Sequence, residues 1–137
     1  MLPDDFPGAA GKYVLDSEVL LAASRFDGAG YLAGYAVECT IKTVAQVEGQ
    51  DPHGHDLNVL SRKALELAAL PTQRTARYLK DPNLTTLSYG DLPGWRHTLR
   101  YQPDGFVGEA NSRVWVAEAR RLYEDVIVRM RIDGVLK

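Results

Sequence analysis

The sequence lacks several features that would place it in a special class of protein. It has one cysteine, Cys39, so no disulfide can form within the chain and nothing points to secretion. Cys39 stands among apolar residues with no candidate base nearby in sequence, which predicts a small buried side chain rather than a reactive thiol. The first twelve residues have neither a basic segment nor an apolar one. We therefore expect no signal peptide and a cytoplasmic protein.

Long apolar runs, strand-like alternation and internal repeats are missing as well. The apolar run between Asp27 and Glu38 has 10 residues, too few to cross a bilayer. A formal net charge of −2 argues against a polycation that binds nucleic acid over its whole surface. With 137 residues, 45% of them apolar, the chain is long enough for one domain with one sizeable core.

Charge is unevenly distributed along the chain. Residues 1–60 carry 3 basic and 9 acidic side chains, whereas residues 61–137 carry 13 basic and 9 acidic ones. Of the 16 basic residues 11 are arginine, whose planar guanidinium suits phosphate and carboxylate partners. This asymmetry is either functional or accidental, and the pattern alone leaves both readings open.

Helical spacing of apolar residues dominates the rest of the chain. Residues 1–12 carry prolines and glycines and are expected to be an irregular lead, after which Asp16 caps a first helix. A second helix covers the stretch from Phe26 to Glu48 and ends at Gly49. Its two neighbouring apolar stripes predict burial over most of its girth.

Three further segments complete the expected fold. A third helix follows the cap Asp56, and a short fourth one starts at Thr72. Residues 81–108 are rich in proline and glycine and are expected to be a long loop. Residues 109–132 form a long closing helix with an apolar stripe, which ends near Gly134. The prediction is a single all-α domain, residues 1–137, folded as an antiparallel up-and-down bundle of four to five helices.

A polar row interrupts the apolar second helix. Tyr31, Tyr35, Glu38 and Lys42 follow one another at helical spacing. Glu38 and Lys42 are either an ordinary ion pair one turn apart or part of a polar groove, and the apolar surroundings favour the groove. Gly30 and Gly34 leave a flat notch in the same helix where a second helix can come close.

Aromatic and basic residues interleave in the loop sequence WRHTLRY, residues 95–101. Trp95, Arg96, His97, Arg100 and Tyr101 have the composition of a surface that contacts phosphates or bases. Alternatively, Trp95 pins the loop to the core and the arginines pair with the acidic first half of the chain. The sequence weighs these two readings about equally.

Metal binding has weak support. His53 and His55 lie on a loop with Asp51 and Asp56, but a His-x-His pair without further ligands is a poor signature. We expect no metal and no cofactor, and we expect Asp56 or His55 to cap the third helix.

Four short motifs, in order, resemble those of the HEPN (higher eukaryotes and prokaryotes nucleotide-binding) domains. Arg25-Phe26-Asp27 is similar to the end of that family's first helix, and the segment from Gly34 to Glu38, followed by Ile41-Lys42, to its signature second helix. His55-Asp56-Leu57 resembles the start of its third helix. Arg100-Tyr101 resembles the pair before its last helix. The resemblance covers about residues 15–130.

The resemblance implies an antiparallel helical bundle, commonly a homodimer, often encoded beside a nucleotidyltransferase in a toxin–antitoxin pair. Some members bind nucleotides, and others cut RNA without metal, using an arginine followed a few residues later by a histidine. That motif is absent here, because His97 directly follows Arg96 and Tyr101 stands near the place of the motif histidine.

Three functions follow as expectations. The first is a nucleotide- or RNA-binding module whose ligand residues are Trp95, Arg96, Arg100, Tyr101, Glu38, Lys42 and Arg113. The second is a metal-independent ribonuclease with His97 as acid or base and Arg96 as charge stabiliser. The third is a non-catalytic subunit that holds a nucleotidyltransferase partner.

Overall fold

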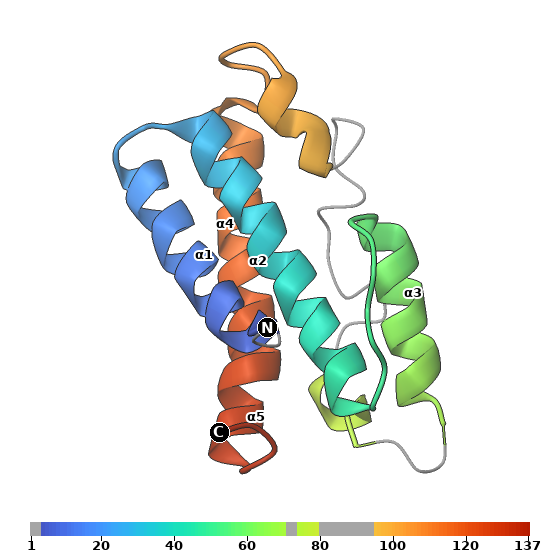
Figure 1. Ribbon diagram of the computed structural model, residues 1–137. Helices are drawn as coiled ribbons and strands as arrows, with labels where there is room; N and C mark the ends of the chain where they lie inside the picture. The colour runs from blue at the N-terminus through green and yellow to red at the C-terminus, as the bar shows by residue number, and fades with distance from the viewer. Residues whose placement is uncertain (1–3, 71–73, 80–94) are drawn as a thin grey trace.

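The computed structural model describes residues 4–70, 74–79 and 95–137, and within them every regular element is a helix (Figure 1). The predicted all-α bundle is confirmed. The elements are α1 (Phe6–Ala22), α2 (Phe26–Val47), α3 (Leu57–Ala68), the 3₁₀ helices η1 (Ala76–Tyr78) and η3 (His97–Tyr101), α4 (Gly108–Tyr123), η4 (Glu124–Val128) and α5 (Arg129–Ile132). The last three, α4, η4 and α5, form one continuous helix in which η4 is a π-helical stretch.

The helix directions differ from the simple up-and-down order that the sequence suggested. Only α1 runs against the others, whereas α2, α3 and α4 all run the same way (Figure 1). The starts of α2 and α4 lie together, since the Val107 N–H donates to the Asp27 carboxylate at 2.9 Å. The Arg74 N–H, beyond the end of α3, donates to Glu48 at the end of α2 at 3.0 Å. The loop between α2 and α3, residues 48–56, carries the chain back along α2, so these two neighbouring helices run the same way (Figure 1).

The first helix begins earlier than expected. The proposed irregular lead, residues 1–12, is wrong from Phe6 onward, because the Asp5 carboxylate caps α1 by accepting the Gly8 N–H at 2.9 Å. Pro7 is compatible with this start, since the first turn of a helix needs no N–H from it. Asp16 is therefore an exposed residue within α1 and not its cap. The buried residues of α1 are Ala10, Val14 and Ser17.

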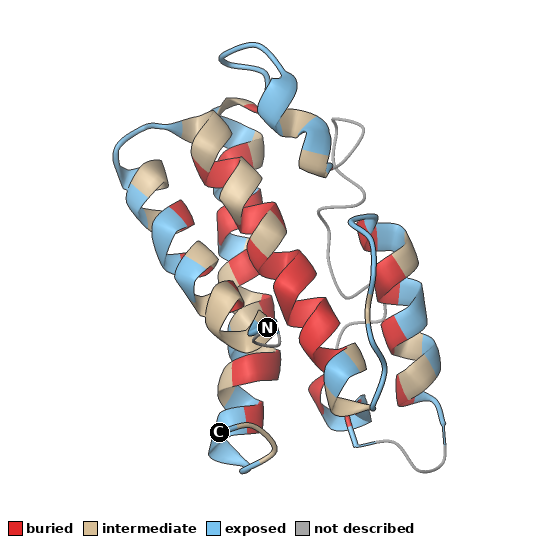
Figure 2. Cartoon of the chain, viewed as in Figure 1, coloured by how far each residue is buried: buried red, intermediate tan, exposed pale blue. Residues whose placement is uncertain are grey.

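Helix α2 is the centre of the bundle and packs against α1, α3 and α4. Its long buried stretch is visible in Figure 2 and confirms the expectation of burial over most of its girth. The helix ends as expected: Gly49 takes a positive φ of 79°, and the Gln50 N–H donates to the Ala45 carbonyl at 2.9 Å.

The glycine notch of α2 is filled, but by side chains. Gly30 faces Val107 and Trp115, and Gly34 lies directly under the Trp95 ring, so a β-carbon at either position would collide with them. The sequence predicted that a second helix would come close to α2 at this notch. Instead, tryptophan side chains lie against the two glycines.

The other expected helices are found with changes. Asp56 caps α3 by accepting the N–H groups of Asn58 and Val59, as expected. The short fourth helix is reduced to η1, and its expected ends at Thr72 and Lys80 lie outside the described residues. The expected loop 81–108 contains the short helix η3, and its residues 81–94 are not described. In the closing helix the predicted stripe is buried: Trp115, Ala119, Leu122, Val126 and Met130.

Candidate functional site: a histidine pair over a buried ion pair

A buried ion pair lies at the middle of α2. The Lys42 ammonium is 3.3 Å from the Glu38 carboxylate, and the two residues are 7% and 4% exposed. An ordinary surface pair at this spacing would be solvated and worth a few tenths of a kcal/mol. This pair is therefore no ordinary surface pair, because other parts of the chain cover Glu38 and Lys42.

His55 is one of the residues that cover Glu38. Its Nδ1 lies 2.9 Å from Glu38 Oε1, although the two residues are 17 positions apart. An ionised carboxylate only accepts hydrogen bonds, so Nδ1 carries the proton and Nε2 is left for another partner. The charge of Glu38 is already balanced by Lys42, so this contact does not require a positively charged imidazole. The His55 side chain is 45% exposed and accessible to a ligand.

His97 of η3 stacks on His55. The two ring centroids are 4.6 Å apart and the rings are tilted by 34°. One histidine comes from the loop before α3 and the other from a segment some forty residues later. The two imidazoles meet because both segments return along the same face of α2.

Trp95 fixes η3 in this place. It is 4% exposed, its indole N–H donates to the Tyr31 carbonyl at 3.0 Å, and its ring packs edge-on against Tyr35 at 5.1 Å. A side chain this buried does not offer a face to a nucleic-acid base. The reading in which Trp95 pins the loop to the core is confirmed, and a stacking role for Trp95 is not supported.

The arginines of this segment remain at the surface. Arg96 is exposed and makes no ion pair with the residues that the structure describes. Arg100 is exposed, and its guanidinium lies 4.8 Å from the Tyr101 ring centroid. Hydrogen bonds to Tyr101 and Tyr31 raise the pKa of Arg100 above its ordinary value. Tyr101 is 71% exposed. The alternative that the arginines pair with acidic residues does not hold for either of them within the described chain.

Two tyrosines of α2, Tyr31 and Tyr35, lie close to Arg100. The Tyr31 hydroxyl donates to the Tyr35 hydroxyl at 3.1 Å. Burial, followed by this hydrogen bond, raises the pKa of Tyr35 well above its ordinary value. The Tyr35 phenol therefore stays neutral at physiological pH and does not cancel the positive charge of Arg100.

Other predicted residues fall outside this cluster. Arg113 lies on α4 and pairs with Glu109 at 2.8 Å, and no contact joins it to the histidines. Cys39 is buried, and burial raises its pKa to about 12, in agreement with an inert thiol. In the described chain no three His, Cys, Asp or Glu side chains come together as a metal site would require.

We call the group formed by His55, Arg96, His97, Arg100 and Tyr101 the histidine–arginine surface; His97 is half-buried and the other four residues are exposed. The sequence predicted four of its members as site residues, but not His55, which it marked as a weak metal ligand, a helix cap and part of the motif at the start of the third helix. A histidine within a Pro/Gly-containing loop gave no spacing signal for the contact with Glu38.

Comparison with known proteins adds no relative: no family model, curated protein or solved structure matches the chain. Among the described helices, none is both long enough and apolar enough to cross a membrane.

Proposed function

We propose that the chain binds the phosphate groups of a nucleotide or of RNA at the histidine–arginine surface. The observation that supports this most directly is that two exposed arginines, Arg96 and Arg100, belong to the same short segment as His97, which stacks on His55. Guanidinium groups bind phosphate through two hydrogen bonds. The HEPN resemblance suggests the same ligand class independently of this geometry.

The surface offers room for a base beside the phosphate. Tyr101 is mostly exposed, and a phenol ring stacks on any base with about 1–3 kcal/mol. Buried Glu38 and Lys42 do not reach the ligand in this arrangement. They act as supports, because Glu38 holds the His55 ring in place.

A second candidate is metal-independent cleavage of RNA, and the Glu38–His55–His97 arrangement favours it. A carboxylate that holds Nδ1 of a histidine leaves Nε2 as a proton acceptor. In such a reaction His55 takes the proton of the ribose 2′-hydroxyl, and the resulting oxygen attacks the phosphorus. His97 gives a proton to the leaving 5′ oxygen, so the products are a 2′,3′-cyclic phosphate and a free 5′-hydroxyl. The arginines stabilise the charge on the phosphorane.

The homodimer and the nucleotidyltransferase partner follow only from the HEPN resemblance, and they stay predictions.

The binding experiment measures the fluorescence anisotropy of a fluorescein-labelled RNA oligonucleotide at low salt in EDTA. We expect the double variant Arg96→Gln/Arg100→Gln to bind at least about tenfold more weakly, with a shallower dependence on salt. The matched control is Arg129→Gln, because Arg129 is an exposed arginine at the opposite end of the bundle (Figure 1). Equal binding by the parent and the double variant, or equal losses in double variant and control, would overturn the proposed surface.

The same samples test cleavage on a denaturing gel. If the chain is a ribonuclease, His55→Ala and His97→Ala each retain binding and lose cleavage. Binding without cleavage by the parent chain supports the first candidate and removes the second.

A further inference from the structure

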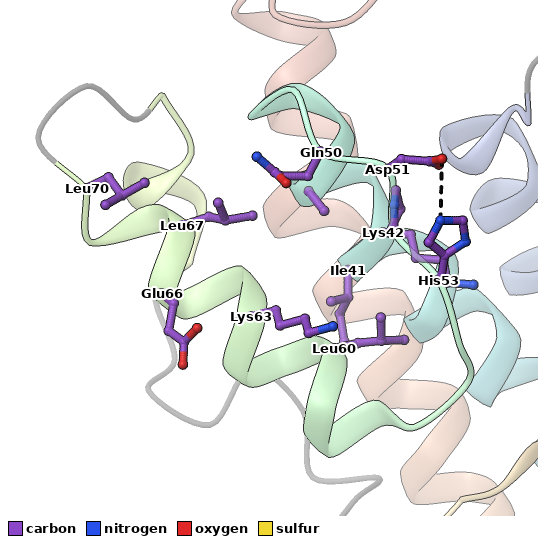
Figure 3. Close-up of a pocket in the computed structure, with 12 residues that line it drawn as sticks. Ile41, Lys42, Gln50, Asp51, His53, Leu60, Lys63, Glu66, Leu67 and Leu70 are labelled. Atoms are coloured by element: carbon purple, nitrogen blue, oxygen red, sulfur yellow. Dashed lines mark ion pairs between the residues drawn. The ribbon is translucent and has the colours of Figure 1, made fainter.

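A cavity of about 440 Å³ lies between α2, α3 and the loop that joins them (Figure 3). It is separate from the histidine–arginine surface, none of whose five residues lines it. Its volume falls in the range of pockets that hold small molecules, about 300–1,000 Å³. Neither the sequence motifs nor the proposed function gives this cavity a role.

The walls of the cavity are mainly apolar. Ile41 and Ala45 come from α2, Leu60 and Leu67 come from α3, and Leu70 follows the end of α3. Leu70 is 52% exposed, which is unusual for a leucine beside so much apolar surface. Because α3 stands beside α2 without closing this space, an apolar molecule would gain burial here.

The charged side chains at the opening of the cavity do not all point toward its apolar walls. Lys63 extends from α3 toward Ile41 and Leu60, whereas the carboxylate of Glu66 is directed away from them (Figure 3). Asp51 is 89% exposed and lies 3.4 Å from His53, so its charge faces solvent and a neighbouring imidazole. Lys42 also lines the cavity, with its ammonium next to Glu38. The accessible charge beside the apolar walls is therefore the Lys63 ammonium.

We propose that this cavity binds a small molecule with an apolar body and an acidic head group. The body lies against Ile41, Ala45 and Leu67, and the head group pairs with Lys63. Molecules with a basic head group are disfavoured, because that group would lie beside the Lys63 ammonium.

The experiment uses two fluorescent probes of similar size with the full chain. One is 8-anilinonaphthalene-1-sulfonate, which has an acidic head group, and the other is neutral N-phenyl-1-naphthylamine. We expect the sulfonate to bind more tightly, and Lys63→Gln to weaken it about threefold to fivefold while leaving the neutral probe unchanged. The control Lys12→Gln removes an exposed lysine of α1 that does not line the cavity and is expected to change neither.

Filling the cavity tests its location. Ala45 is partly buried in the wall, so Ala45→Trp places an indole in the space and should abolish binding of both probes. The matched control is Ala117→Trp, at an exposed position of α4. Leu67→Glu provides a second variant should Ala45→Trp fail to fold, and it should reject the sulfonate more strongly than the neutral probe. Circular dichroism confirms the fold of each variant. Probe binding that survives in all folded variants, or no binding by the parent chain, would overturn the proposal.

Discussion

The Nδ1 atom of His55 lies 2.9 Å from the carboxylate of Glu38, which also lies 3.3 Å from the ammonium of Lys42. A loop histidine, a buried acid and a buried base are thus joined in one chain of contacts. Glu38 is the centre of that chain, and its two partners stabilise it differently. Lys42 balances its charge, and His55 satisfies one of its oxygens.

Replacing one partner of the Lys42–Glu38 ion pair should lower the free energy of unfolding more than replacing both. Lys42→Met leaves a buried carboxylate without its balancing charge and is expected to lower the free energy of unfolding by about 3 kcal/mol. The double variant Lys42→Met/Glu38→Gln should recover a large part of that loss, because no charge is then left unpaired. Urea unfolding followed by circular dichroism measures both values. Lys12→Met is the exposed control, expected within about 0.5 kcal/mol of the parent. If Lys42→Met were as stable as the parent, the Lys42–Glu38 pair would be solvated in solution.

Gly34 should tolerate no side chain. In Gly34→Ala the new β-carbon collides with the Trp95 ring, so the ring and η3 must move, at an expected cost of about 1–3 kcal/mol. Trp95 would become exposed, which shifts its fluorescence to longer wavelength, whereas Trp115 stays buried.

The matched control for Gly34 is Gly28→Ala in the same helix. Its β-carbon meets only the end of the Leu20 side chain, at 3.1 Å, so the higher helix propensity of alanine should leave the protein equally stable or more stable. Similar destabilisation at both positions would contradict the role given to Trp95.

Asp27 should make stability depend on acid pH. Burial raises its pKa, but the hydrogen bonds from the N–H groups of Val107 and Gly105, with smaller contributions from Asp104 and Arg25, outweigh burial and leave the pKa below its ordinary value. A carboxyl with a lower pKa in the folded chain stabilises the fold above its unfolded pKa of about 4, and this contribution is lost as the pH falls further.

The corresponding measurement is urea unfolding of the parent and of Asp27→Ala between pH 7 and pH 2.5. At pH 7 the variant should be less stable by about 2 kcal/mol, since two hydrogen bonds to a charged group are removed. The difference should shrink as the pH falls below about 4. A difference that stays constant down to pH 2.5 would mean that the carboxylate charge has no part in holding the start of α4.

Cys39 should react slowly with thiol reagents. Burial raises its pKa to about 12, so the reactive thiolate is rare at pH 8, and the side chain is only 6% exposed. We expect slow reaction with 5,5′-dithiobis(2-nitrobenzoic acid) in buffer and fast reaction in urea. Equally fast labelling under both conditions would show that α2 opens readily at this position.

The helical elements followed from local chemistry. The apolar stripe of the closing helix, the Asp56 cap of α3 and the Gly49 end of α2 each depend on residues within about one or two turns, which is why the sequence predicts them well. The start of α1 was missed because Pro7, Gly8 and Gly11 suggest irregular backbone. Proline is nevertheless accepted in a first helical turn, and packing against α2 and α4 outweighs the low helix propensity of glycine.

The site was predicted only in part. Arg96, His97, Arg100 and Tyr101 are close in sequence, so their composition alone marked them as a surface for phosphate. The burial of Trp95 was one of two open readings, and only its position over Gly34 decided between them. His55 was missed because its partner lies 17 residues away and its other neighbour, His97, is farther still.

The sequence by itself determined that the chain is a helical bundle with an apolar central helix, because amphipathic spacing and helix caps act over a few residues. The tertiary structure decided which helices run parallel. It also decided that Glu38, His55 and His97 meet on one face of α2. These contacts depend on chain segments that are far apart in sequence, and they form only when the core of α1, α2 and α4 holds those segments together.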